Sequence, residues 1–266
     1  MNKIVVQKYG GTSIGDVEKL KSIAKKVSDK KEAGFFPIVV VSAMGKSTDE
    51  LVRMSEEVTF NKKSPDLREK DTLLSTGELV SSTLLAISIK SLDKKVISLS
   101  GSQAGITTDD IHGSARISDI NTSRILQEIK EDKIIIIAGF QGVNIDGDIT
   151  TLGRGGSDTT AVALAAALNA DVCEIYTDVE GIYTTDPRIV SNAKKLDKIN
   201  YEDMLEMAVL GAKMHPRSIE LASIYDVPVY VAGTFSKETG TLITKGVNME
   251  KTKTVTGIAI DKNVSK

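Results

Sequence analysis

The alternation of β-branched runs with amphipathic helical stretches is the feature that most constrains the fold of this chain. It is typical of parallel strands joined by helical crossovers. The expected strands cover residues 4–8, 37–42, 95–99, 134–140, 174–177, 227–231 and 240–244. The expected helices cover residues 16–28, 49–58, 70–91, 119–131, 158–168, 201–210 and 216–225. The sequence therefore predicts an α/β fold, a three-layer α/β/α sandwich with a mainly parallel open sheet.

Two segments interrupt this alternation, residues 105–118 and 142–152, and both are rich in glycine, aspartate and threonine. The second contains Asp146-Gly147, a dipeptide that favours the tight turn of a hairpin. We expect both segments to form β-hairpins over the edge of the main sheet.

Composition and charge exclude several classes of protein. Of the 266 residues, 41% are hydrophobic and 26% are charged, as in a globular chain with ample material for a core. One large α/β unit, or two lobes that share a sheet, accounts for this length better than separate domains. The 34 basic and 36 acidic residues give a formal charge of −2, so bulk charge indicates neither nucleic-acid nor membrane binding. Any anion-binding site must be local.

Residues that form disulfides or bind zinc are scarce. The lone Cys173 excludes an internal disulfide framework, and with only His112 and His215 beside it the chain lacks the cluster of a structural zinc site. No apolar run reaches membrane-spanning length, and the amino terminus enters a strand directly. We therefore expect a cytoplasmic protein.

The segment GRGGSDTTA at residues 153–161 brings a cation, flexible backbone and a helix start together. Glycines let the main chain approach a ligand, and the free N–H groups of the first helical turn attract negative charge. Taken alone, the segment fits equally well with a glycine-rich turn in which Ser157 or Asp158 caps the helix.

A second glycine pair follows the first strand, in the segment KYGGTS at residues 8–13. Lys8 and the pair Gly10-Gly11 lie at the carboxyl end of a central strand, where open α/β sheets bind ligands, and they suit a phosphate. A plain turn with a surface lysine is the alternative. A P-loop is excluded because its first glycine would fall on Val40, and a dinucleotide fingerprint is excluded because its third glycine would fall on Asp158.

Two further polar segments follow later strands. Residues 177–188 (TDVEGIYTTDPR) could line a nucleotide pocket or form plain turns. Residues 211–217 (GAKMHPR) place Lys213 just before a helix that has Pro216 in its first turn. By itself, Lys213 is explained better as a solvated surface residue.

Together with residues 41–48 (VSAMGKST) and 76–78 (TGE), these segments make the chain resemble the amino-acid kinase family, and within it the branch that acts on aspartate. The match runs in order over essentially the whole chain, without a departure at the charged positions of the motifs. The resemblance implies an eight-stranded, mainly parallel sheet between helical layers, with the amino acid bound by the first part and ATP by the last.

The resemblance also implies a reaction. The γ-phosphoryl group of ATP would pass to the side-chain carboxylate of L-aspartate, the first step towards lysine, threonine and methionine. A carboxylate is already ionised at neutral pH, so no general base is required. The difficulty is the approach of an anion to a triphosphate, which Lys8, Lys213 and magnesium would offset.

By resemblance, Lys8 with the Gly10-Gly11 backbone holds the transferring group, Lys213 contacts ATP phosphates, and Asp158 orients both lysines. Arg154 clamps a substrate carboxylate, and Glu78 receives the α-ammonium group. The residues implied for the amino-acid substrate are Ser42, Thr48, Glu78, Arg154, Gly155, Gly156 and Ser157. Those implied for the nucleotide are Lys8, Tyr9, Gly10, Gly11, Thr12, Ser13, Thr177, Asp178, Tyr183, Asp186, Pro187, Arg188, Lys213 and Met214.

The resemblance leaves two kinds of alternative function open. A kinase of the same fold could act on N-acetylglutamate, glutamate or UMP, and a nucleotide-binding regulator could have lost catalysis.

We expect a homo-oligomer, with residues 1–247 as the kinase unit and residues 248–266 as a linker and the start of a regulatory region. This form would then lack the lysine or threonine effector site.

Overall fold

A computed structural model describes residues 3–211, 213–246 and 257–258, and within them the main sheet has eight strands. Neighbouring strands are parallel except β11 and β12, which are antiparallel. In sheet order they are β10 (Lys198–Asn200), β12 (Thr241–Thr244), β11 (Val229–Gly233), β9 (Val172–Thr177), β1 (Lys3–Tyr9), β2 (Phe35–Val41), β6 (Ile134–Ala138) and β3 (Val96–Leu99). The predicted parallel sheet is confirmed.

Helices cover both faces of this sheet. Within β2, Val39 and Val41 pack with α1 and α3 on one face, whereas Ile38 and Val40 pack with α5 on the other. Both faces are therefore apolar, as expected for a parallel sheet between helical layers, and the predicted three-layer sandwich is confirmed. The helices are α1 (Val17–Glu32), α2 (Ser47–Glu57), η1 (Phe60–Lys62), α3 (Leu67–Lys90), α4 (Ser123–Lys130), α5 (Gly156–Ala167), α6 (Tyr201–Val209) and α7 (Pro216–Ile224).

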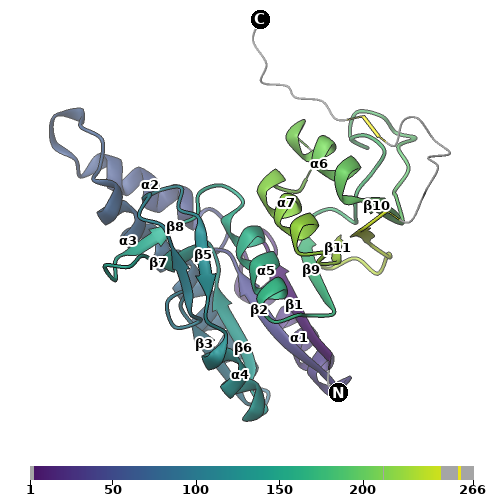
Figure 1. Cartoon of the computed structure of the whole chain (residues 1–266), viewed down its shortest axis with the longest axis horizontal. Coiled ribbons are helices and arrows are strands. Elements are labelled where there is room, and N and C mark those ends of the chain that lie inside the picture. The colour runs from purple at the N-terminus through teal and green to yellow at the C-terminus, as the bar shows by residue number, and fades with distance from the viewer. Residues whose placement is uncertain (1–2, 212, 247–256, 259–266) are drawn as a thin grey trace, which may run out of the picture.

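The two glycine-rich segments form hairpins that join into a second sheet, in the order β5-β4-β7-β8. Its strands are β4 (Ile106–Thr108), β5 (Ile117–Ile120), β7 (Gln141–Val143) and β8 (Ile149–Thr151). Both segments form the expected hairpins, and β4 of one pairs in parallel with β7 of the other, which joins them into a single sheet. Figure 1 shows α2, α3 and the second sheet on one side of α5, and α6, α7 and β10 on the other.

Other expectations need small corrections. Residues 119 and 120 belong to β5 rather than to a helix. Helix α4 begins at Ser123, whose amide donates a hydrogen bond to the Asn121 side chain (3.0 Å). Strand β10 was not expected, because only Ile199 of its three residues is buried and so no alternation is visible. Strand β6 ends at Ala138, since Phe140 turns the chain with a φ of 70°.

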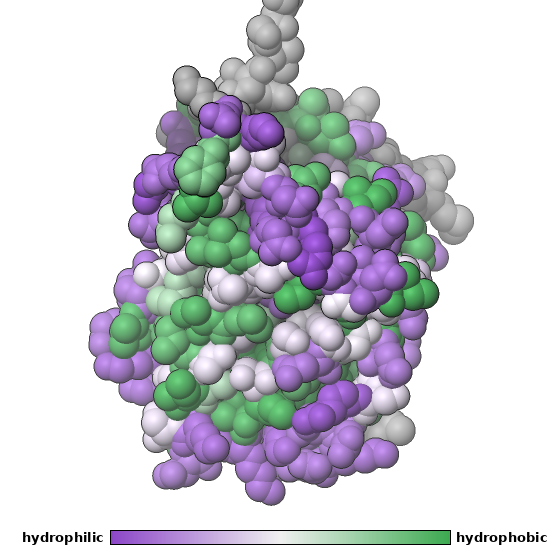
Figure 2. Space-filling model, turned by 90° about the vertical axis from the view of Figure 1, so that its left-hand side faces the viewer, coloured by the Kyte–Doolittle hydropathy of each residue, from purple (hydrophilic) through white to green (hydrophobic). Residues whose placement is uncertain are grey.

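The 24-residue helix α3 is long and apolar enough to cross a membrane by length and composition alone. Half of its most apolar stretch is buried, and the helix packs on β3, β6 and α1 as a core helix of the sandwich. Figure 2 views the side where α2 and α3 lie and shows apolar patches broken by polar side chains.

The expected boundary at residue 247 and most of the expected linker lie outside the described residues. Of residues 248–266, expected to be a linker and the start of a regulatory region, residues 257–258 are described. The Ile258 amide donates a hydrogen bond to the Thr184 carbonyl (2.8 Å), so this part of the chain contacts the loop that follows β9.

Candidate active site

The candidate site lies where the carboxyl end of β1 meets the first turn of α5. Strand β1 pairs with β2 on one side and β9 on the other, so the strand order reverses here, which is where open α/β sheets bind ligands. Two cavities, of about 960 and 300 Å³, open on this region. Both are lined by Lys8, Gly11, Gly45 and Asp158, which therefore mark their junction.

An ion pair occupies the junction. The Nζ atom of Lys8 lies 2.5 Å from Oδ1 of Asp158, and both side chains are nearly buried. Asp158 is the acidic residue in the first turn of α5, where the helix dipole and free N–H groups favour negative charge. A β-carbon on Gly11 would lie 2.7 Å from the Ala43 carbonyl, so glycine is required for the close approach of these two turns.

The smaller cavity brings together six of the residues predicted for the nucleotide besides Lys8. They are Gly10, Gly11, Thr12, Thr177, Lys213 and Met214. Lys213 pairs with Asp178 (Nζ to Oδ1, 2.5 Å), and this contact lowers the pKa of Asp178. Asp158 therefore pairs with Lys8, whereas Lys213 has a different carboxylate partner from the one expected.

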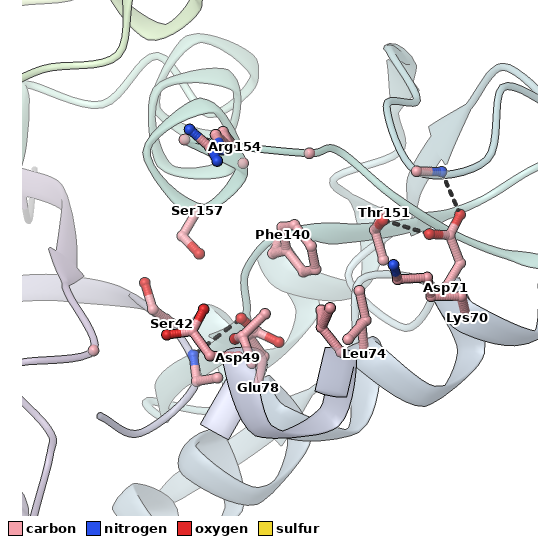
Figure 3. A pocket seen from close by; sticks show the side chains of 18 of the residues that line it. Ser42, Asp49, Lys70, Asp71, Leu74, Glu78, Phe140, Thr151, Arg154 and Ser157 are labelled. Carbon is pink, nitrogen blue, oxygen red and sulfur yellow. Dashed lines mark hydrogen bonds between the residues drawn. The ribbon is translucent and has the colours of Figure 1, made fainter. Parts of the chain in front are cut away.

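The larger cavity is lined by all seven residues predicted for the amino-acid substrate: Ser42, Thr48, Glu78, Arg154, Gly155, Gly156 and Ser157. Arg154 enters from the turn before α5 and Glu78 from α3, and Figure 3 shows them with Ser42 and Ser157 around the same space. Within the described part of the chain, Arg154 has no ion-pair partner. An exposed guanidinium and a buried carboxylate thus line one cavity.

Glu78 has a lone oxygen in this cavity. The side chain is 3% exposed, and its Oε1 accepts a hydrogen bond from the Ala43 amide (3.0 Å). Its Oε2 is buried and lacks a hydrogen-bond partner among the described residues. Burial raises the pKa of Glu78 to about 7. A buried carboxylate oxygen without a partner is costly, and a cationic group in the cavity would satisfy it.

Sequence reasoning missed several residues of the cavity wall. Asp71 and Leu74 lie two turns and one turn, respectively, before Glu78 on the same face of α3, and this spacing could have indicated them. Asp71 accepts hydrogen bonds from Thr151 Oγ1 (2.5 Å) and the Gly113 amide (2.9 Å). Phe140, the wall residue with a φ of 70°, carried no signal in the sequence.

Several residues predicted for the nucleotide line neither cavity. Tyr9 is buried and stacks on Tyr176, with ring centroids 5.0 Å apart, while the hydroxyl of Ser13 is hydrogen-bonded to that of Thr234 (2.6 Å). Their side chains therefore face the core, and only their backbone is placed near the junction.

The loop after β9 carries the remaining predicted nucleotide residues. Tyr183 donates a hydrogen bond to Glu180 (3.2 Å), and Arg188 pairs with Asp186 (2.8 Å). Pro187 is exposed between the two members of that pair. A role for these four residues in nucleotide binding stays a prediction.

The sequence profile described as "Amino acid kinase family" matches residues 3–233. The chain belongs to the amino acid kinase family. It is 52% identical, over 99% of its length, to a protein of Geobacillus stearothermophilus named aspartokinase, and it spans 64% of that relative. It therefore covers less than two thirds of the curated relative.

Solved structures of this family are similar to the whole described fold. The aspartate kinase from Synechocystis superposes with a TM-score of 0.81 and 45% identity, over 93% of this chain and 40% of that one. Aspartokinase III of E. coli, in complex with aspartate and ADP, superposes with a TM-score of 0.84 and 30% identity, over 93% of this chain and 66% of that one.

Proposed function

We propose that this member of the amino acid kinase family transfers the γ-phosphoryl group of ATP to the side-chain carboxylate of L-aspartate, giving 4-phospho-L-aspartate and ADP. The observation that carries the proposal is the unpaired, buried Oε2 of Glu78 in the same cavity as the guanidinium of Arg154. An α-amino acid has an ammonium group and a carboxylate that match these two charges. The name of the E. coli relative's complex, with aspartate and ADP, supports the same substrates.

The larger cavity would hold the amino acid by its charged groups. Arg154 would bind a carboxylate through two parallel hydrogen bonds, since its planar fork matches the two oxygens. Glu78 would accept hydrogen bonds from the α-ammonium group, which would also lower the pKa of this carboxyl again. Ser42 and Thr48, which line the same cavity, would donate hydrogen bonds to the carboxylates.

The smaller cavity would hold the phosphates of ATP. Gly10, Gly11 and Thr12 line it with backbone, and Lys213 contributes a cation at its wall. The transferring group would then lie at the junction, next to Lys8. The bond between the γ-phosphorus and its bridging oxygen breaks as a bond to the aspartate carboxylate oxygen forms.

Charge, rather than proton transfer, is the problem that this site would solve. Free aspartate has a side-chain pKa of about 3.9, so its nucleophilic oxygen is already ionised. Two like charges about 4 Å apart repel by about 4 kcal/mol at an effective dielectric of 20. Lys8 at the junction and Lys213 beside the phosphates would offset this repulsion and follow the charge into the transition state.

Magnesium accompanies ATP in this proposal. No group of three or more His, Cys, Asp or Glu side chains suited to a metal occurs in the described residues, and Asp158 and Asp178 each pair with a lysine. These residues fit an ion that is carried by phosphate oxygens and water rather than by a protein cage. When bound, it would neutralise part of the phosphate charge.

An ADP-release assay with L-aspartate, L-glutamate, N-acetyl-L-glutamate and UMP as acceptors tests the proposal. We expect turnover that depends on aspartate, because an acylated amine leaves Glu78 without a cation and UMP has no ammonium group. A preference for N-acetylglutamate or UMP would show that this acceptor, rather than aspartate, is the substrate. ADP binding without turnover of any acceptor would instead favour a nucleotide-binding regulator.

A further inference from the structure

The turn that carries Arg154 is closed by a hydrogen bond from the Gly156 amide to the Gly153 carbonyl (3.0 Å), but it is built on two flexible glycines. Gly153 and Gly155, on either side of Arg154, have φ values of 73° and 70°, the left-handed region that glycine adopts easily. Such a turn has many alternative conformations, so the direction of the Arg154 side chain depends on contacts from elsewhere in the fold. These contacts come mainly from α7.

Arg217, the second residue of α7, provides two of them. Its Nη1 donates a hydrogen bond to the Leu152 carbonyl (3.0 Å), and its Nη2 donates one to the Ala115 carbonyl (2.9 Å). The guanidinium is half-buried, burial lowers its pKa, and it forms no ion pair with a carboxylate among the residues that the structure describes. Its fork therefore serves two backbone oxygens, a task that suits arginine better than lysine.

The Leu152 and Ala115 carbonyls belong to two segments of the chain that lie side by side. The Ala115 amide donates a hydrogen bond to the Thr151 carbonyl (2.9 Å), so the segment before Arg116 runs beside the segment that enters the Arg154 turn. Arg217 spans both of them at the point where β8 ends and the turn begins.

A second contact fixes the other end of the turn. A β-carbon on Gly155 would lie 2.3 to 2.7 Å from the ring and Cβ of His215, so the imidazole packs directly on the Gly155 backbone. His215 is the N-cap of α7, and its ring nitrogen accepts a hydrogen bond from the Arg217 amide (3.4 Å). The start of α7 therefore holds the residues before and after Arg154.

The same helix start adjoins the smaller cavity, since Lys213 and Met214 immediately precede His215 and line it. We propose that Arg217 is a positioning residue. It fixes the Arg154 turn against the helix that follows Lys213, and so holds the substrate-binding guanidinium of Arg154 at a constant distance from the smaller, phosphate-binding cavity. This inference rests on the proposed function for its kinetic consequence. The positioning itself does not depend on which acid is the substrate.

The kinetic test is a double-mutant cycle of Arg217→Met and Arg154→Ala. A small misplacement of a substrate-binding group costs up to a hundredfold, so Arg217→Met should raise the KM for aspartate by about tenfold or more. The KM for ATP should change by less than about twofold. In the Arg154→Ala background, Arg217→Met should add less than about twofold, because the group that it positions is gone. Arg217→Lys should resemble Arg217→Met more than the wild type.

A matched control separates positioning from stability. Ala222→Gly weakens the same helix by at least about 1 kcal/mol, because a good helix former is lost and the methyl group of this buried residue leaves the core, so it should lower the melting temperature and leave the KM for aspartate unchanged. If Ala222→Gly raises this KM as much as Arg217→Met, or if the effects of Arg217→Met and Arg154→Ala multiply, the positioning role is overturned.

Amide hydrogen exchange gives a readout that does not need turnover. Arg217→Met should speed exchange in residues 150–157, whose Leu152 and Gly156 amides are bonded within the turn and its neighbours, and Ala222→Gly should not. Unchanged exchange in an active enzyme overturns the positioning role alone. Faster exchange in a protein that does not use aspartate overturns the proposed substrate while the positioning stands.

Discussion

Arg154 and Glu78 are the two side chains whose charges would recognise an α-amino acid, and each must meet a different chemical requirement. Arg154 has to offer two parallel donors from an exposed position, whereas Glu78 has to be ionised although it is buried. Four predictions at the residue scale follow from these demands and from the position of Lys8 at the junction.

Arg154→Lys should impair aspartate use much more than ATP binding. A point charge cannot reproduce two parallel hydrogen bonds, and the loss of a charge-assisted contact costs on the order of 2 kcal/mol, a rise of tens-fold in the KM for aspartate. Steady-state kinetics with each substrate varied in turn measures the effect. Arg124→Lys, on the exposed face of α4, is the matched control. A rise in the KM for ATP alone would contradict the role of Arg154.

Glu78 should give aspartate use a pH dependence. Because burial raises its pKa to about 7, the side chain is protonated below this pH and loses its attraction for the ammonium group. The kcat/KM for aspartate should then fall about tenfold per pH unit below about 7, and this break should disappear in Glu78→Gln. A profile that stays flat in the wild type from pH 8 to 5.5 would contradict it.

The same shift makes a prediction for stability. A carboxyl whose pKa is raised from 4.5 to about 7 on folding stabilises the native state below pH 4.5, and this contribution is lost as pH rises through about 7. Relative to Glu78→Gln, the free energy of unfolding of the wild type should therefore fall between pH 4.5 and 7. Urea unfolding at several pH values measures it, and a rise over this range would show that the folded pKa is not raised.

Lys8→Ala should lower kcat with little change in either KM, since its charge would act on the phosphoryl group mainly during transfer. Removal of one such donor costs about two to three orders of magnitude. Single-turnover assays of a variant with an unchanged circular dichroism spectrum measure this loss. Wild-type turnover in the folded variant would rule the role out.

At the scale of elements, the start of α5 against the start of α7 is the contact on which the site depends. Gly155→Ala introduces a β-carbon 2.3 Å from the His215 side chain at a φ of 70°, so the two helix starts must move apart. We expect a loss of on the order of 3 kcal/mol in unfolding free energy and a higher KM for aspartate.

Gly34→Ala separates the two causes of this loss. Gly34 also has a positive φ, 87°, but a β-carbon there would meet nothing within 4 Å. This variant should lose only about 1 kcal/mol, the cost of the left-handed backbone, with unchanged kinetics. Equal losses in thermal unfolding of the two variants would show that contact with His215 is unimportant.

At the scale of the whole molecule, the two cavities meet, so ligands should stabilise the fold without turnover. Aspartate at 100 times its Kd should add about 2.7 kcal/mol, which corresponds to a rise of roughly 5–10 °C in Tm. ADP should also raise the melting temperature, whereas UMP at the same concentration should leave it unchanged. Thermal scans with each ligand measure this, and a UMP shift equal to that of aspartate would contradict the assignment of the larger cavity.

The sequence alone determined the order of the α-helices and of the main-sheet strands other than β10, because each of these elements has a hydrophobic pattern of its own. It also indicated Lys8, Gly10 and Arg154 as candidates, because glycines next to cations at strand ends suit an anionic ligand, although a plain turn could also explain each segment taken alone. The substrate roles of Glu78, Ser42 and Thr48 came from the resemblance to the family. Local pattern could not indicate Phe140, β10 or the pairing of β4 with β7, because these depend on partners distant in the chain.

Only the tertiary structure decided which charges face one another. It paired Lys213 with Asp178 rather than with Asp158, turned Tyr9 and Ser13 into the core, and left Oε2 of Glu78 without a partner. It also placed Arg217 on the carbonyls of Leu152 and Ala115. The physical reason is that hydrogen bonds and ion pairs depend on distances of a few ångströms between residues that are 35 to 221 positions apart, and no local pattern of residues encodes such distances.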